Sequence, residues 1–124
     1  MGALEERALP GVTFRPVWFQ PVFQKHANER CGGVQVHITS RTLFRPVATG
    51  IHMIDTVRRL WPSESGWRVP KGERGGQGGM PYIDRLYGSA RLRERFEDGA
   101  DAEQIIGTWD TSAFEARRRR AFVY

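Results

Sequence analysis

The sequence predicts a single α+β domain, in which a small mixed sheet packs against about four or five helices. The length of 124 residues is that of one domain and is sufficient to bury a hydrophobic core. Two segments alternate apolar and polar residues, which is the pattern of half-buried strands. Beyond them, apolar residues recur at three- and four-residue steps between capping residues, which is the pattern of helices.

The first strand is predicted directly after a short helical tail. Residues 2–9 have the composition of the end of a helix, and the breaker pair Pro10-Gly11 closes it. Apolar side chains then occupy every second position of the segment Val12–Phe19. Because Pro16 lacks a backbone N–H, this strand is expected at a sheet edge or at a bulge.

The clearest strand begins at the glycine pair at positions 32 and 33, and its side chains divide into two sets. An apolar set is expected to face the core: Val34, Val36 and Ile38. A polar set is expected to face solvent or a cleft: Gln35, His37 and Thr39.

The longest predicted helix covers residues 46–61, because a proline occupies its first turn and a Trp-Pro pair ends it. A short strand is expected at 67–69. The glycine-rich segment 70–81 is predicted to be a flexible loop. It lacks the lysine and hydroxyl residue that complete a phosphate-binding loop, so nucleotide binding there is not expected.

The last third of the chain is predicted to be helical. Residues 81–87 form a short helix that Gly88 closes. Ser89 is predicted to cap the next helix. Asp101 and Gln104 form a capping-box pattern at the start of a further helix.

The net charge is +5, and nearly all of the positive charge is arginine, whose planar fork grips carboxylates and phosphates. An arginine-rich composition typical of a GC-rich genome explains most of this bias, and an acidic ligand remains the alternative. The run Arg117–Arg120 points around a helix in all directions. It is therefore predicted to be solvated surface rather than a stripe that binds nucleic acid.

Neither a metal nor a cofactor is expected from the sequence. Cys31 is the only cysteine, which excludes an intrachain disulfide, and it is predicted to pack rather than to act as a nucleophile. His26, His37 and His52 do not combine with it in the spacing of a zinc site. No apolar run approaches the ~20 residues that cross a bilayer, so no membrane span is expected.

No catalytic residue is expected in this chain. Glycoside hydrolysis and related chemistry need two carboxylates at a fixed separation, and the sequence offers no obvious pair. Asp55 and Asp84 lie in predicted helices near arginines, and both are expected to be ion-paired rather than catalytic.

The polar side of the second strand is the best candidate for a binding surface. His37 projects from it beside two other polar residues, and two arginines follow along the chain. A histidine there can be a half-exposed residue satisfied by its neighbours or can line a cleft, and the sequence leaves both readings open. The candidate substrate-binding residues are Gln35, His37, Thr39, Arg41 and Arg45.

Four segments carry a resemblance to a known family. They are Leu9–Val17 (LPGVTFRPV), Cys31–Thr39 (CGGVQVHIT), Phe44–Val47 (FRPV) and Ile83–Ser89 (IDRLYGS). In this order and spacing the chain resembles the C-terminal domain of the NamZ-type exo-β-N-acetylmuramidases of bacterial peptidoglycan. The resemblance extends from about residue 9 to residue 124, and the Cys31–Thr39 segment is its most specific part.

The resemblance implies that residues 1–124 are an accessory domain that completes the substrate cleft of an enzyme. A Rossmann-like N-terminal domain, absent here, is expected to hold the catalytic carboxylate, so the chain is not expected to be active alone. The implied substrate is a terminal N-acetylmuramic acid of cell-wall glycan, and the implied setting is bacterial, exported or periplasmic. Arg41 or Arg45 can hold the lactyl carboxylate of that sugar through paired hydrogen bonds.

Two other functions are compatible with the sequence. A free-standing, non-catalytic module that binds glycan or a partner protein is the main alternative. A nucleic-acid binder, suggested by charge alone, ranks last and would show strongly salt-dependent binding.

Overall fold

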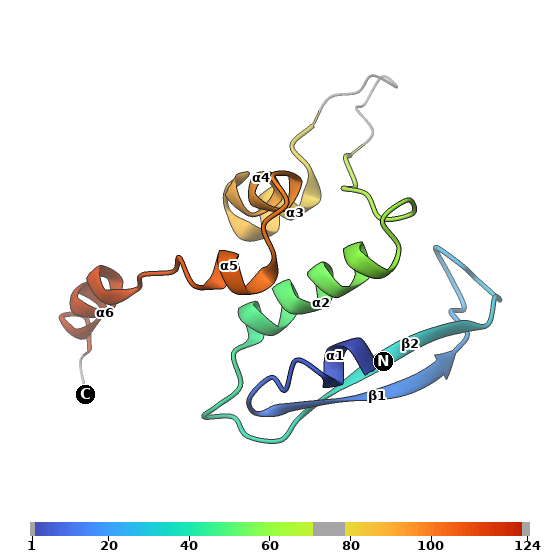
Figure 1. Cartoon of the computed structure of the whole chain (residues 1–124), viewed down its shortest axis with the longest axis horizontal. Helices are drawn as coiled ribbons and strands as arrows, with labels where there is room; N and C mark the ends of the chain where they lie inside the picture. Colours follow the sequence, from blue (N-terminus) through green and yellow to red (C-terminus); the bar gives the residue numbers. More distant parts are fainter. Residues whose placement is uncertain (1, 71–78, 123–124) are drawn as a thin grey trace. The chain divides into compact units, whose positions relative to one another are not determined.

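The computed structural model describes residues 2–70 and 79–122, so residues 71–78 of the predicted glycine-rich loop lie outside the described residues. Within these ranges the chain forms six helices and one two-stranded sheet (Figure 1), which confirms the predicted α+β class. The elements in chain order are α1 (Gly2–Glu5), β1 (Val12–Phe19), β2 (Cys31–Ile38), α2 (Pro46–Leu60), α3 (Tyr82–Tyr87), α4 (Arg91–Glu97), α5 (Ala102–Ile106) and α6 (Ser112–Arg119).

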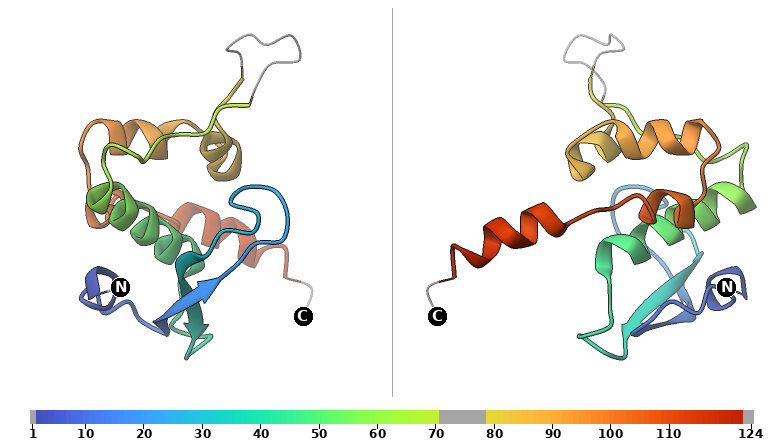
Figure 2. Two further views of the ribbon diagram at one scale, coloured as in Figure 1. Left: turned by 90° about the vertical axis from the view of Figure 1, so that its right-hand side faces the viewer. Right: turned by 60° about the vertical axis from the view of Figure 1, so that its left-hand side comes forward.

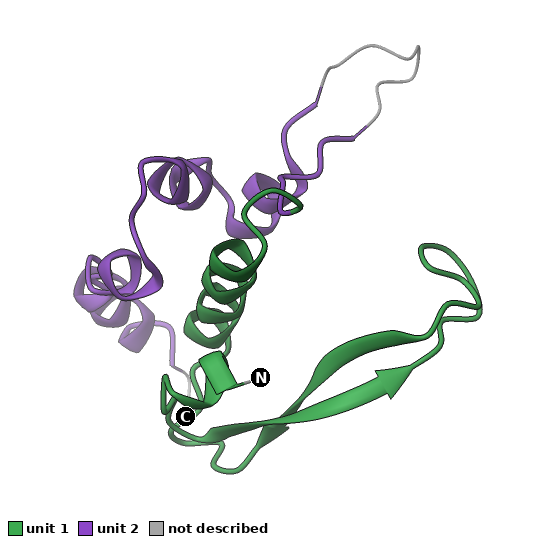
Figure 3. Ribbon diagram, turned by 45° about the vertical axis from the view of Figure 1, so that its right-hand side comes forward, with its two compact units in different colours: residues 1–64 green, residues 65–124 purple. Residues whose placement is uncertain are grey.

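The chain forms two compact units, which Figure 3 colours separately. Unit 1 comprises residues 1–64 and contains α1, β1, β2 and α2. Unit 2 comprises residues 65–124 and contains α3 to α6. The described helices number six rather than about four or five, and the basic segment that was expected to be helical forms the last of them, α6.

The sheet in unit 1 is an antiparallel hairpin, not the mixed sheet that was predicted (Figure 2). Its register pairs Val12 with Ile38 at one end and Phe19 with Cys31 at the other. Because paired residues point to the same side, the register places the even-numbered residues of both strands on one face and the odd-numbered residues on the other. We call the first the apolar face. Four odd-numbered residues define the polar face: Thr13, Arg15, Gln35 and His37.

The hydrophobic core of unit 1 lies on the β1 side of the apolar face. Leu4 of α1 packs there with Val12 and Phe14, and all three are buried. Helix α1 contacts both β1 and α2, which closes this side of the hairpin. The partly buried residues around this core are Leu9, Val34, Phe44 and Met53.

The prediction that the whole apolar set of β2 faces the core is wrong for two of its three members. Val34 packs against the core, but Val36 and Ile38 are 39% and 55% exposed. Alternation along a strand sorts side chains between two faces, but it does not show how much of a face the rest of the chain covers. In unit 1 the packed residues bury the apolar face at β1 and leave most of it exposed at β2.

The glycine pair that opens β2 makes room for two aromatic rings of β1. Trp18 lies opposite Gly32 in the register, and its ring atoms come within 3.3 Å of the position that a Cβ of residue 32 would occupy. The Phe19 ring comes within 2.9 Å of the equivalent position at Gly33. The two rings therefore cover strand backbone that carries no side chains of its own. The guanidinium of Arg30 lies 4.6 Å from the Trp18 ring centroid, within cation–π distance.

The N-terminal helix is shorter than predicted, because α1 ends at Glu5 and not at residue 9. Ala8 adopts a φ of +45° and Gly11 a φ of +72°, and neither value is compatible with a right-handed helix. In contrast, α2 matches its prediction to within one residue, with Pro46 in its first turn and Trp61 as its C-cap.

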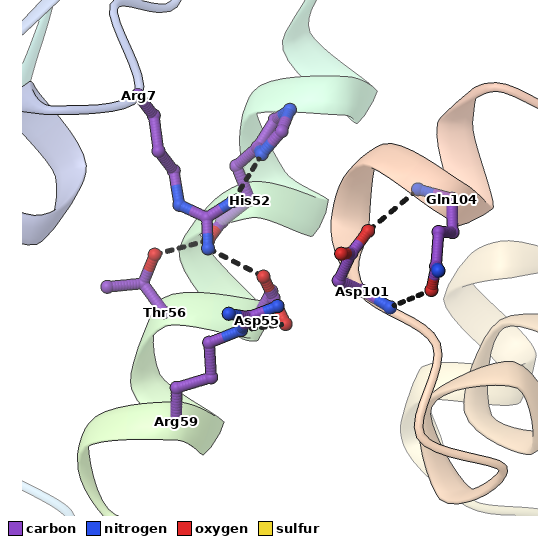
Figure 4. A network of polar contacts seen from close by, with 7 residues as sticks. All are labelled: Arg7, His52, Asp55, Thr56, Arg59, Asp101 and Gln104. Atoms are coloured by element: carbon purple, nitrogen blue, oxygen red, sulfur yellow. Dashed lines mark hydrogen bonds and ion pairs between the residues drawn. The ribbon is translucent and has the colours of Figure 1, made fainter.

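Unit 2 confirms two of its predicted helix boundaries and corrects another. Gly88 ends α3 in the left-handed conformation, with φ +83°, as predicted. The capping box of α5 forms, with 2.8 Å from the Gln104 N–H to the Asp101 carboxylate and 3.0 Å for the return bond (Figure 4). Ser89 does not cap α4. Its N-cap is Ala90, which makes no side-chain capping bond.

The short strand predicted at 67–69 does not form. Instead of entering a sheet, the Trp67 ring packs against Phe96 of α4 with 6.1 Å between ring centroids.

The carboxyl group of Asp110 lies just before α6. Hydrogen bonds from the Ser112 side chain and backbone N–H lower the pKa of this carboxyl group.

Gly11 determines the course of the segment that follows β2. Its carbonyl accepts hydrogen bonds from the backbone N–H groups of Thr39 (2.9 Å) and Ser40 (3.3 Å). A Cβ at this position would lie 2.6 Å from both the Ser40 carbonyl oxygen and the Phe44 nitrogen. These are backbone atoms of a segment that is itself hydrogen-bonded, so they cannot yield easily. A residue with a side chain is excluded here by its φ and by space.

We expect Gly11→Ala to lower the free energy of unfolding by about 2 kcal/mol or more, because it combines a left-handed residue with a backbone clash. Urea unfolding followed by circular dichroism measures the change. Gly50→Ala is the matched control, since Gly50 lies inside α2 with nothing within 4 Å of its added Cβ. The control is expected to stabilise the protein by about 0.5–1 kcal/mol. Equal effects of the two substitutions would contradict this account of Gly11.

Candidate functional site

The structure brings two of the five predicted site residues onto one surface, the polar face of the hairpin. Gln35 pairs with Arg15 and His37 pairs with Thr13 across the two strands. Gln35 is exposed and His37 is half-buried. The Nε2 atom of His37 is buried and has no hydrogen-bond partner among residues 2–70 and 79–122. A buried ring nitrogen without a partner has an unfavourable free energy of about 1–3 kcal/mol.

The other three predicted residues lie in the connection from β2 to α2. Thr39 is exposed, and its backbone N–H is bound to Gly11. Arg45 is the N-cap residue of α2, and its carbonyl accepts the Thr49 N–H at 2.9 Å. Arg41 and Arg45 are both exposed. In the described part of the chain, no hydrogen bond or ion pair joins any two of the five predicted side chains, and neither arginine has an ion-pair partner.

Sequence reasoning missed Arg15 as a member of this surface. It is exposed on the polar face directly opposite Gln35, and no ion pair of its side chain occurs within the described residues. The alternation of β1 contained the signal, because Arg15 falls between two apolar positions. Only the strand register shows that Arg15 lies opposite Gln35 and that the next pair on the same face is Thr13 and His37.

The acid that was predicted to be ion-paired in α2 is confirmed as such (Figure 4). Asp55 is 4% exposed, and its Oδ2 lies 2.6 Å from Nη2 of Arg7 while its Oδ1 accepts from Nε of Arg59 at 3.1 Å. The Arg7 guanidinium also lies 3.0 Å from Nδ1 of His52, which is buried. The hydroxyl of Thr56 donates to the His52 carbonyl at 2.8 Å. Asp55 therefore anchors the residues after α1 to α2.

The second predicted ion pair is also present, in unit 2. Asp84 of α3 is 3% exposed, and both of its oxygens accept from Nε of Arg93 of α4 at 3.1 and 3.0 Å. This hydrogen bonding raises the pKa of the Arg93 guanidinium above its usual value. Arg93 also donates to Glu97 at 3.0 Å. Both buried acids thus hold helices together.

Two kinds of site are not seen in the described ranges. No cluster of three or more His, Cys, Asp or Glu side chains that could hold a metal ion occurs there. No described helix is long and apolar enough to span a membrane.

The comparisons with known proteins place the chain in a class and then in a family. The chain is a member of a bacterial peptidoglycan muramidase family. More particularly, residues 1–124 match the family model described as the C-terminal part of the exo-β-N-acetylmuramidase NamZ, and the chain belongs to that C-terminal family.

One curated relative and one solved structure illustrate the family and its fold. The chain is 33% identical over 118 residues to the peptidoglycan β-N-acetylmuramidase NamZ of Bacillus subtilis (strain 168), which covers 94% of this chain and 26% of that protein. A crystal structure of a DUF1343 family protein from Bacteroides fragilis has the same fold, with a TM-score of 0.70 and 24% identity over 99% of this chain and 31% of that one. The chain therefore spans about a quarter of the first and a third of the second.

We expect Asp55→Asn to destabilise the protein by about 3 kcal/mol, because it leaves the Arg7 guanidinium without its anionic partner in a largely buried site. Chemical denaturation measures the loss. Glu97→Gln is the matched control, since Glu97 has a similar bond to an arginine but is 45% exposed. The control is expected to cost less than about 1 kcal/mol. A loss at Asp55 as small as at Glu97 would show that the buried pair is not an anchor.

Proposed function

We propose that this chain is an accessory domain of a peptidoglycan exo-β-N-acetylmuramidase. In this proposal it packs against an N-terminal catalytic domain and completes the cleft that holds a terminal N-acetylmuramic acid of the cell-wall glycan. The catalytic carboxylate belongs to the N-terminal domain. The two faces of the hairpin have separate tasks: the apolar face docks on the catalytic domain, and the polar face lines the cleft.

The observation that carries the docking role is the exposure of the apolar face. Trp18 is 66% exposed, and Val36 and Ile38 are also open. A two-stranded hairpin is marginally stable in water by itself, and an exposed apolar strip of this kind usually meets a partner. The chain covers 26% of the curated relative, which is therefore about four times as long as this chain. The remainder of such a protein is the partner that the apolar face fits.

The polar face supports the role in the cleft. It is open to solvent at Arg15 and Gln35, so it is not part of the unit's own core. The Nε2 atom of His37 has no hydrogen-bond partner among the described residues and is itself buried, so in this proposal the ring turns toward the face when a ligand binds. A sugar hydroxyl or acetamido group can supply the missing hydrogen bond, since it carries both donors and acceptors.

Arg41 and Arg45 are proposed to bind the lactyl carboxylate, which distinguishes N-acetylmuramic acid from N-acetylglucosamine. Both are exposed and lie in the connection that the Gly11 hydrogen bonds hold beside the start of β1. A guanidinium binds a carboxylate through two parallel charge-assisted hydrogen bonds, which orient the ligand as well as attract it.

We expect Arg41→Ala or Arg45→Ala, made in a protein that joins this domain to its N-terminal catalytic domain, to raise KM for a muramyl substrate about tenfold or more. Steady-state kinetics on a chromogenic N-acetylmuramic acid glycoside give the measurement. Arg119→Ala is the matched control, because Arg119 is an exposed arginine of α6 in unit 2. An unchanged KM in both the Arg41 and the Arg45 variant would remove the arginines from the proposed site.

We expect the 124-residue chain alone to give no turnover of the same glycoside, and activity to appear only when the N-terminal domain is supplied. The reason is that its buried acids are bound by arginines and stabilise the fold. Hydrolysis by the isolated chain would refute the accessory role. If the chain binds glycan but has no effect on the activity of the N-terminal domain, the alternative of a non-catalytic binding module is the correct one.

A further inference from the structure

Unit 2 contains a concavity of about 350 Å³, and none of the proposed substrate-binding residues of unit 1 lines it. The end of α3, one side of α4, and the end of α5 with the residues after it line this space. Its volume is at the lower end of the range for small-molecule sites, which suits one sugar ring rather than a long ligand. We call it the α4 groove and define it by six residues: Tyr87, Arg91, Glu94, Arg95, Asp98 and Trp109.

The aromatic residues of the α4 groove are fixed to one another. The indole N–H of Trp109 donates to the hydroxyl of Tyr87 at 3.2 Å, which joins the segment after α5 to the last residue of α3. Trp109 is 37% exposed, so part of its ring remains open to a ligand. A fixed aromatic ring at the edge of a groove is a surface on which the C–H side of a sugar ring can pack, because both are flat and apolar.

Two arginines of the α4 groove are free to bind an anion. Arg91 and Arg95 are four residues apart on α4, so they lie on the same side of the helix. Both are exposed, and within the described residues neither takes part in an ion pair. Arg93, between them, is different, because it is bound to Asp84 and Glu97. The helix thus uses one arginine for the fold and presents two at the groove.

Two carboxylates complete the chemistry of the groove and exclude some ligands. Glu94 and Asp98 are also four residues apart and line the same space. They can accept hydrogen bonds from hydroxyl groups. Their repulsion grows with the charge of the ligand, so a polyphosphate with several negative charges fits less well than a ligand with a single carboxylate, and a nucleotide is a poor fit. Four charged side chains in so small a space also make a purely apolar ligand a poor fit.

We infer that the α4 groove binds a sugar ring that carries a carboxylate. The ring packs on Trp109, its hydroxyls donate to Glu94 and Asp98, and its carboxylate binds Arg91 and Arg95. The site is a second saccharide site of the chain, separate in sequence from the polar face and free of any role in hydrolysis. The inference rests on the proposed function only for the source of the ligand, a cell-wall glycan.

The test is a calorimetric titration of the whole 124-residue chain with two sugars, made in an Arg41→Ala, Arg45→Ala background so that the two arginines of the proposed cleft do not contribute to binding. N-acetylmuramic acid and N-acetylglucosamine share the same ring, but only the first has a carboxylate. We expect the first to bind about tenfold or more tightly, which is the usual effect of a charge-assisted pair. Arg91→Gln combined with Arg95→Gln should remove this preference. Trp109→Ala should weaken the binding of N-acetylmuramic acid about tenfold or more.

Matched controls separate these effects from general changes. Trp61→Ala removes another exposed tryptophan, at the end of α2 in unit 1. Arg117→Gln combined with Arg119→Gln removes the same charge from α6. Both should leave the titration unchanged. Circular dichroism checks that each variant is folded, and the arginine substitutions on the exposed side of α4 remain informative even if Trp109→Ala unfolds.

Three results would overturn the inference. The first is equal affinity for the two sugars, and the second is unchanged binding in the α4 groove variants. The third is a loss of binding on going from the unmodified chain to the Arg41→Ala, Arg45→Ala background, which would place the sugar in unit 1. Failure of the proposed function has a different signature, because it appears in the turnover of the two-domain protein and leaves this titration as it is.

Discussion

The ion pair between Arg7 and Asp55 ties the N-terminal segment to α2, and the arrangement of unit 1 depends on it. A four-residue helix such as α1 has no stability of its own in water. It keeps its place because Leu4 packs on β1 while Arg7, just beyond the helix, is bound to a buried carboxylate of α2. Since α1 covers the β1 side of the hairpin, the same ion pair determines which part of the apolar face is buried.

Local signals in the sequence predicted the elements well. The bounds of β1, the left-handed Gly88 and the Asp101–Gln104 capping box agree with the structure, because each depends on residues that are close together in the chain. The ion pairs of Asp55 and Asp84 were also predictable, since buried acids need cationic partners. The end of α1 and the N-cap of α4 were local errors, whereas the other failures depend on distant parts of the chain. Periodicity could not show that Val36 and Ile38 stay open, or that Trp67 packs on a helix instead of entering a sheet.

The candidate site was predictable only as a list of residue types. The polar alternation of β2 correctly placed Gln35 and His37 on one face, but the antiparallel register was needed to add Arg15 to it. The α4 groove had no sequence signal of this kind. Its residues come from three helical segments, and Arg91 and Arg95 differ from Arg93 only in what the fold places beside them. Which arginine stays available to a ligand is a property of tertiary structure.

Gly11 and Gly33 of unit 1 differ in whether evolution or a protein engineer can replace them with a residue that has a side chain. A methyl group at position 11 would meet backbone on two sides, so that site admits a single amino acid for as long as the fold persists. At position 33 the obstacle is the ring of Phe19, which can rotate away or be exchanged for a smaller residue. The far end of the hairpin can therefore be rebuilt by paired substitutions in its two strands, while the near end stays as it is.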